Sequence, residues 1–219
     1  MPTPRIATVY LAARQRIDDL VRPLPDDDLE APVPACPGWT VHAVVSHLTA
    51  IPEWAAAGRI RGIPTDEDTA AQVAELADVP TVEVLDRWGA SAPGFSEILA
   101  AADIWPAAID AVTHEHDIRH ALGRPGDRDS DDVQLLAGVA LQGWAPTRPV
   151  EVATPSGTAR FGPAEGDAAR WVTTDFEVLR ARLGRRSLRQ LAAMDWSEDP
   201  SEVLGDLALF TPAEVDIEE

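Results

Sequence analysis

The sequence contains no lysine. All 18 basic residues in its 219 positions are arginine, which excludes Schiff-base chemistry and the phosphate-binding lysine of a P-loop. Acidic residues number 37, so the formal net charge is -19. A negative field of this size repels a phosphate backbone. We therefore expect no nucleic-acid partner.

Cysteine and long apolar runs are also scarce. Cys36 is the only cysteine, which excludes an intramolecular disulfide and a cysteine-rich zinc site. No run approaches the ~18 consecutive apolar residues of a membrane helix, and the amino terminus shows no apolar core of a secretory signal. The composition, 45% hydrophobic and 25% charged, is that of a globular protein. We expect a soluble, cytoplasmic protein that does not bind membranes.

The first 125 residues predict a helical domain. Apolar residues recur there at spacings of three and four, which is typical of helices. Helices are expected over residues 5–21, 41–51, 66–77 and 105–122, and another begins at Pro80-Thr81 and includes Trp88; a further segment covers residues 95–102. Thr40 is a plausible N-cap for the second of these. Pro52 should kink or end that helix, Pro93-Gly94 should form a turn, and residues 32–37, with three prolines, should form an extended loop.

The pattern changes after a linker at Pro125–Asp132 that is rich in aspartate, glycine and proline. Apolar and polar residues alternate over Pro149–Thr154, which predicts a strand. After a turn, Thr158–Phe161 is predicted as the second strand of a hairpin. The region also contains a short β-branched segment at 171–173 and expected helices over 133–144, 175–183, 187–194 and 201–209. The predicted fold class is α+β, with an up-down four-helix bundle in residues 1–125 and a small α+β domain in residues 126–219.

The histidines suggest a metal site in the bundle. Asp110 and His114 are four residues apart and therefore share one helix face, which Asp117 extends. His47 lies beside the apolar stripe of its own helix and should face the interior. Two histidines and a carboxylate on facing helices leave coordination positions open, as a catalytic ion requires.

Spacing alone does not select these residues. His116 and His120 are also four apart, on another face, and form an equivalent candidate pair. Helix histidines more often satisfy core hydrogen bonds than bind metal. His42 should face away from His47, on the surface.

Two segments carry a family resemblance. Pro37–Val41 (PGWTV) leads into Val45–Leu48 (VSHL), and Asp110–Gly123 reads DAVTHEHDIRHALG. Together they resemble the two signatures of the mycothiol-dependent maleylpyruvate isomerase family, whose DinB-like bundle precedes a small α+β domain. The resemblance covers most of the chain and is more specific for the family than for a reaction.

The resemblance implies a ligand set. In the family a divalent ion, usually zinc, is held by a bundle histidine, a glutamate and a histidine four residues later, which correspond to His47, Asp110 and His114. Asp110 departs from the usual glutamate and is one methylene shorter. An aspartate can ligate zinc, but the ion or the helix must then shift to meet it, which leaves room for His116 or Asp117 to assist.

The resemblance also implies thiol chemistry with mycothiol and a small electrophile. A thiolate that adds to an activated double bond, permits rotation and leaves again is an isomerase catalyst, and addition without elimination makes an S-transferase. The alternative is a metal- or ligand-binding relative without turnover, which the aspartate favours slightly. A helical hydrolase is a third hypothesis, but no G-x-S-x-G motif is present.

Other residues receive plainer interpretations. Cys36 has no neighbour in sequence that activates it and is interpreted as incidental. The arginines between Arg180 and Arg189 are expected on a solvated helix face paired with local acids, with contact to a carboxylate substrate or the thiol as the alternative. Asp117 and Arg119 are expected to pair, to orient a ligand histidine, or to end the helix.

Overall fold

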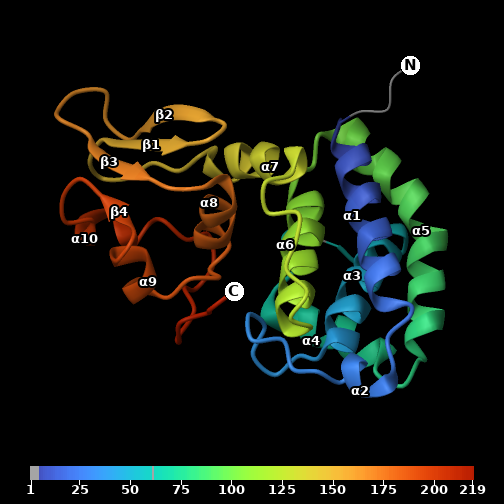
Figure 1. Ribbon diagram of the computed structural model, residues 1–219. Helices are drawn as coiled ribbons and strands as arrows, with labels where there is room; N and C mark the ends of the chain where they lie inside the picture. The colour runs from blue at the N-terminus through green and yellow to red at the C-terminus, as the bar shows by residue number, and fades with distance from the viewer. Residues whose placement is uncertain (1–4, 61) are drawn as a thin grey trace. The chain divides into compact units, whose positions relative to one another are not determined.

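The computed structural model describes residues 5–60 and 62–219, so residues 1–4 and 61 of the predicted first domain lie outside the described residues. The chain divides into two compact units, one ending at Arg124 and the other spanning Pro125–Glu219. The first unit is helical and the second combines helices with a four-stranded sheet (Figure 1). This is the α+β architecture that the sequence predicts.

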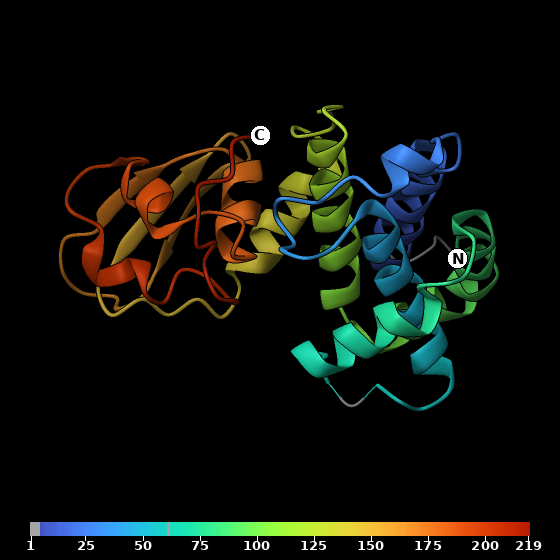
Figure 2. The ribbon, with the colours of Figure 1, turned by 90° about the horizontal axis from the view of Figure 1, so that it is seen from below.

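The described part of the first unit is a bundle of long helices with two shorter ones. Its elements are α1 (Arg5–Val21), α2 (Asp26–Leu29), α3 (Val41–Ala56), α4 (Asp66–Leu76), α5 (Thr81–Ala102) and α6 (Pro106–Ala121). Helix α1 packs against α5 and α6, and α3 packs against α4, α5 and α6. Figure 2 shows the unit along another direction, with α4 lying across the end of α3. The short α2 falls in the acidic segment where no helix was predicted.

Two helices continue through prolines, which corrects the predicted turn at Pro93-Gly94 and, of the two alternatives for Pro52, the predicted end of the helix. Helix α3 passes through Pro52 to Ala56, and α5 passes through Pro93 to Ala102 without a turn. A proline inside a helix removes one hydrogen bond and costs ~3 kcal/mol. Beyond these prolines Trp54 and Leu99 are buried, and each such side chain contributes ~1.5–3 kcal/mol when it leaves water. Burial along the whole stripe therefore outweighs the local penalty.

The loop before α3 is closed rather than extended, which corrects the prediction for residues 32–37. The Val33 N–H donates to the Trp39 carbonyl and the Trp39 N–H donates to the Cys36 carbonyl, each at 2.9 Å. Gly38 adopts φ 85°, a conformation that side chains with a Cβ rarely tolerate. The loop thus holds Cys36 and Trp39 in fixed positions. It ends at the predicted cap, where Thr40 accepts from the Ala43 N–H at 3.3 Å.

The second unit is a small sheet with helices packed on it. Its elements are α7 (Asp131–Leu141), β1 (Val150–Thr154), β2 (Gly157–Phe161), β3 (Ala169–Val172), α8 (Asp175–Arg182), α9 (Leu188–Ala192), β4 (Asp195–Trp196) and α10 (Ser201–Leu204). The strand order is β2-β1-β3-β4, and β1 and β3 are parallel. The predicted hairpin is present. Strand β4 was not predicted, and α9 and α10 are shorter than expected.

One face of this sheet forms the core of the second unit. Val150, Val152 and Trp171 from the strands pack with buried side chains of α7, α8, α9 and α10. The ring of Trp171 stacks on Trp196 of β4, with centroids 5.1 Å apart and planes at 7°. Strand β2 lies at the sheet edge and is mostly exposed.

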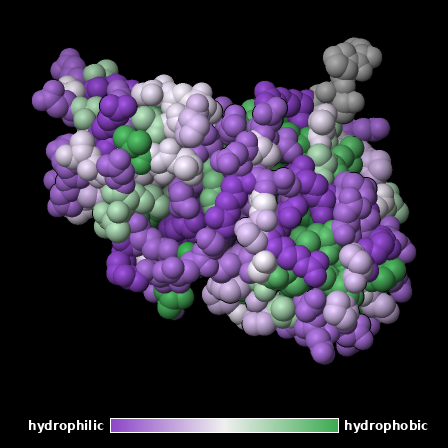
Figure 3. Space-filling view, viewed as in Figure 1, coloured by the Kyte–Doolittle hydropathy of each residue, from purple (hydrophilic) through white to green (hydrophobic). Residues whose placement is uncertain are grey.

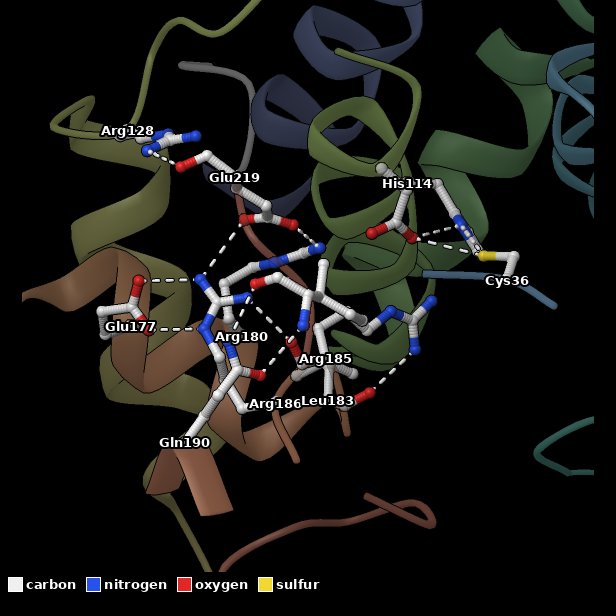
Figure 4. A network of polar contacts seen from close by, with 12 residues as sticks. Cys36, His114, Arg128, Glu177, Arg180, Leu183, Arg185, Arg186, Gln190 and Glu219 are labelled. Carbon is white, nitrogen blue, oxygen red and sulfur yellow. Dashed lines mark hydrogen bonds and ion pairs between the residues drawn. The ribbon is translucent and has the colours of Figure 1, made fainter. Parts of the chain in front are cut away.

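Arg180, Arg182 and Arg186 are buried, which corrects the prediction of a solvated face for these three, whereas Arg189 is exposed and pairs with Asp216. Arg180 and Arg186 are buried and both pair with Glu219, and Arg186 also pairs with Glu177 at 2.7 Å (Figure 4). Buried Arg182 instead donates to the carbonyls of Ala140, at 2.8 Å, and Leu207. The expected local acidic partner is present for Arg186, as Glu177, whereas Glu219, the partner of Arg180, lies 39 residues away in sequence.

The outer surface agrees with the high charge. On the face shown in Figure 3, hydrophobic residues gather only in small patches among hydrophilic ones. The large exposed hydrophobic side chains include Ile63, Val82, Ile98 and Phe210. No helix of the described residues is both long enough and apolar enough to cross a membrane.

Candidate metal centre

Three predicted ligands converge between α3 and α6. His47 Nε2 lies 3.3 Å from Asp110 Oδ2, and His114 Nε2 lies 3.4 Å from Asp110 Oδ1. The two imidazole centroids are 5.4 Å apart. Both histidines are almost fully buried, whereas the Asp110 side chain keeps 32% of its exposure. The group is therefore buried on the histidine side and accessible along the carboxylate.

Each histidine is anchored through its other nitrogen. His47 Nδ1 lies 2.8 Å from Gln72 Oε1 on α4, and His114 Nδ1 lies 3.0 Å from Asp117 Oδ2 on α6. An oxygen acceptor at Nδ1 holds the ring proton there and leaves the Nε2 lone pair free as a ligand. Both Nε2 atoms then face the Asp110 carboxylate, to which they donate when protonated and beside which they can hold a cation when unprotonated.

The spacing of these atoms fits a small cation. A tetrahedral zinc ion bound at about 2.0 Å by nitrogen and oxygen leaves about 3.3 Å between neighbouring ligand atoms. The observed nitrogen-to-oxygen separations are 3.3 and 3.4 Å. Each histidine nitrogen therefore lies at ligand spacing from one oxygen of the Asp110 carboxylate. The ligand atoms of all three residues lie within 4.8 Å of one another.

Aromatic side chains surround the group. The Trp39 ring lies 5.2 Å from the His47 ring and stacks 6.2 Å from the His114 ring, centroid to centroid. Tyr10 accepts a 2.8 Å hydrogen bond from Trp88. Burial, and to a lesser degree the Asp110 charge, raises the pKa of Tyr10 above its ordinary value. Tyr10 therefore stays a neutral phenol near the site, and Trp39 shields both imidazoles.

The neighbouring charges of α6 have separate partners. Glu115 is buried and pairs with Arg16 of α1 at 2.8 Å and with Arg119 at 3.0 Å. Asp117 instead faces His114. Of the roles predicted for Asp117, the structure thus shows contact with the ligand histidine. Glu115 ties α6 to α1 and keeps the α6 backbone in place beside α3.

The other histidines have different surroundings. His42 is half-buried, with Nδ1 2.8 Å from Thr81 Oγ1 and Nε2 3.2 Å from the Leu76 carbonyl, so its predicted place on the surface was wrong. Its ring joins the end of α4 to the start of α5. Within the residues that the structure describes, neither His116 nor His120 belongs to a group of three possible ligands.

Sequence reasoning missed two residues beside the site. Gln72 stands in an acidic helix outside both quoted segments, and only the packing of α4 on α3 brings it to His47. Cys36 lies near His114 and Asp117 through the closed loop. Neither contact has a signal in local periodicity.

The fold and this group of residues define a class: a helical bundle with an open site of two histidines and one carboxylate, followed by a small α+β unit. The chain belongs to the family described as the mycothiol maleylpyruvate isomerase N-terminal domain, whose sequence profile matches residues 10–124. No curated protein has a sequence that matches this chain.

Two solved structures share the fold. A crystal structure of the mycothiol-dependent maleylpyruvate isomerase is 15% identical, with a TM-score of 0.56 over 93% of this chain and 96% of that one. A crystal structure of a histidine-to-alanine mutant of that enzyme is 14% identical, with a TM-score of 0.53 over 84% of this chain and 90% of the other. At these identities the likeness describes the fold of both units.

Proposed function

We propose that this protein is a metal-dependent, mycothiol-using isomerase or S-transferase that acts on a small electrophilic metabolite in the cytoplasm. The observation that carries the proposal is the convergence of the two Nε2 atoms of His47 and His114 on the Asp110 carboxylate, with each Nδ1 anchored by an acceptor. The partners are a small thiol and a small electrophile, with no nucleic acid and no membrane.

The residues present fit a divalent ion, for which we favour zinc. His47, Asp110 and His114 supply nitrogen and oxygen donors at suitable spacing, and three protein ligands leave a position open for a substrate. A divalent ion held there supplies the positive charge that keeps a coordinated thiol deprotonated.

The chain's own residues prepare this site. Gln72 and Asp117 hold the ring protons on Nδ1, so neither ligand nitrogen needs to lose a proton. Trp39 covers both imidazoles and excludes water from that side. The partly exposed Asp110 marks the side from which thiol and electrophile arrive.

The electrophile decides which of the two reactions follows. Addition of a thiolate to an activated double bond forms a carbon–sulfur bond and leaves a single bond about which the product rotates. Loss of the thiolate then restores the double bond in the other geometry, which is isomerisation. With an electrophile that retains sulfur, the same addition is an S-transfer.

The test joins metal analysis to turnover. Purified protein should contain close to one divalent ion per chain, and His47→Ala should lose it. Wild-type protein should convert members of a panel of activated alkenes and epoxides only with mycothiol and the ion together. Protein without bound metal, and no rate above the metal-free background, would refute the proposal.

A second candidate is a metal-binding relative without turnover, which acts as a ligand-binding or interaction module. Asp110 in place of the family's glutamate favours it. The same experiment separates the two, because this candidate requires a stoichiometric ion with no reaction on any electrophile.

A further inference from the structure

A second group of possible metal ligands lies on the far side of His114. Cys36 Sγ is 3.7 Å from His114 Nδ1 and 3.5 Å from Asp117 Oδ2. In Figure 4 the sulfur points at the His114 ring, with dashed lines to the ring and to a carboxylate. We propose that these three residues form a second cation site, selective for a thiolate-preferring divalent ion, which shares His114 with the first site through the opposite ring nitrogen.

The distances match those of a coordination site. A tetrahedral ion bound at about 2.3 Å by sulfur and about 2.0 Å by nitrogen and oxygen leaves about 3.5 Å from sulfur to each other ligand and about 3.3 Å between the other two. The observed separations are 3.7, 3.5 and 3.0 Å. The sulfur-to-oxygen separation equals the expected value, and the other two differ from theirs by a few tenths of an ångström. An ion therefore fits without a change of backbone.

The ligands come from rigid elements. Asp117 and His114 lie on α6 and are buried, and Cys36 lies in the closed loop that Gly38 permits. Cys36 itself is only half-buried, so an ion can reach the site along the sulfur. A sulfur, a nitrogen and an oxygen together prefer a softer ion such as cadmium over magnesium or calcium.

Binding at this site replaces hydrogen bonds with coordination bonds. The ion displaces the proton of the Cys36 thiol and the Nδ1 proton of His114, and both protons pass to water. The Asp117 oxygen that accepts the ring proton becomes the third ligand. When the first site is filled as well, His114 carries no ring proton and bridges the two ions as an imidazolate.

Cadmium added to metal-free protein tests the proposal. Because Cys36 is the only cysteine, a sulfur-to-cadmium charge-transfer band in the ultraviolet reports this residue alone. We expect a band that saturates at one equivalent, together with alkylation of Cys36 by iodoacetamide that cadmium slows by about tenfold or more. The alkylation measurement uses wild-type protein and does not depend on a variant.

Two variants separate the sites. His47→Ala should keep the band while it loses zinc at the first site, and Cys36→Ser should lose the band while it still binds one zinc ion. If wild-type protein shows the cadmium band but binds no zinc, only the proposed function is refuted. Absence of the band in wild-type protein overturns the second site. Loss of the band in folded His47→Ala also overturns it, since Cys36 would then serve the first ion.

Discussion

Replacing Gln72 with methionine removes the oxygen that faces His47 Nδ1, and we expect zinc binding to weaken by 10–100-fold. That range is typical for loss of a hydrogen-bond partner behind a metal-binding histidine. Gln72 is fully buried, so no water takes the place of its oxygen, and methionine has a similar volume. The His47 ring is then free to carry its proton on Nε2, where it blocks the ligand position.

The magnitude follows from the buried hydrogen bond. A 10–100-fold loss corresponds to about 1.4–2.7 kcal/mol, and an unsatisfied buried donor costs about 1–3 kcal/mol. Gln72 Nε2 has no hydrogen-bond partner among the described residues. Methionine removes this amide as well, which offsets part of the loss. We therefore expect metal-free Gln72→Met to unfold with a free energy only about 1 kcal/mol below wild type.

The assay is zinc competition against a chelating dye, with urea unfolding of the metal-free proteins beside it. Gln72→Glu keeps an acceptor oxygen and should bind zinc far better than Gln72→Met. Thr49→Val is the matched control, because Thr49 is buried on the same helix as His47 and donates to the Val84 carbonyl at 3.4 Å. It should lower stability and leave zinc affinity unchanged.

One result would refute the reasoning. If folded Gln72→Met binds zinc as tightly as wild type, Gln72 does not hold the Nδ1 proton of His47. Of the two histidines that face Asp110, only His114 would then have a partner that holds its proton on Nδ1.

Three further predictions follow from the same structure. Asp110→Asn should weaken zinc binding by about 100-fold or more in the competition assay, since a charged ligand contributes more than the partners behind it; unchanged affinity would exclude Asp110 as a ligand. Trp171→Ala should cost about 3–5 kcal/mol of unfolding free energy, because it opens the core and unstacks Trp196. The Arg59 guanidinium lowers the pKa of Glu75 below 4.5, so Glu75 stabilises the fold above that pH and the contribution disappears as pH falls. Both side chains are nearly half exposed, so urea titrations of Glu75→Gln and wild type should differ slightly at neutral pH and converge in acid.

Periodicity predicted most of the elements but not where helices continue. At Pro52 and Pro93 the local rule gave a break, and burial of residues on both sides of each proline favoured one continuous helix. Whether burial outweighs the cost of the proline depends on which other helices cover the apolar face, and local sequence does not contain that information. The predicted cap was correct, since Thr40 accepts from a backbone N–H three residues away.

In the candidate site, too, local sequence predicted some residues and only tertiary packing explains the others. Asp110 and His114 share a helix face at a spacing of four, His47 was added because it lies beside the apolar stripe of another helix, and the family resemblance favoured these three. Gln72 and Cys36 reach the site only through tertiary packing, one from α4 and the other from a loop closed by backbone hydrogen bonds. No pattern within either segment distinguishes them from ordinary surface or loop residues.

Arg182 occupies a position where arginine has a physical advantage over lysine, a residue that this sequence lacks. Its guanidinium is buried and donates to backbone carbonyls, and burial lowers its pKa to about 10. It remains a cation at neutral pH and donates in two directions, joining the end of α7 to the segment around Leu207. A lysine in water has a pKa of about 10.4, so the same burial would lower its pKa towards neutral pH. Its ammonium group would also contact the carbonyls from a single nitrogen. Where a buried cation joins two segments within the second unit, arginine therefore keeps its charge and its contacts better than lysine would.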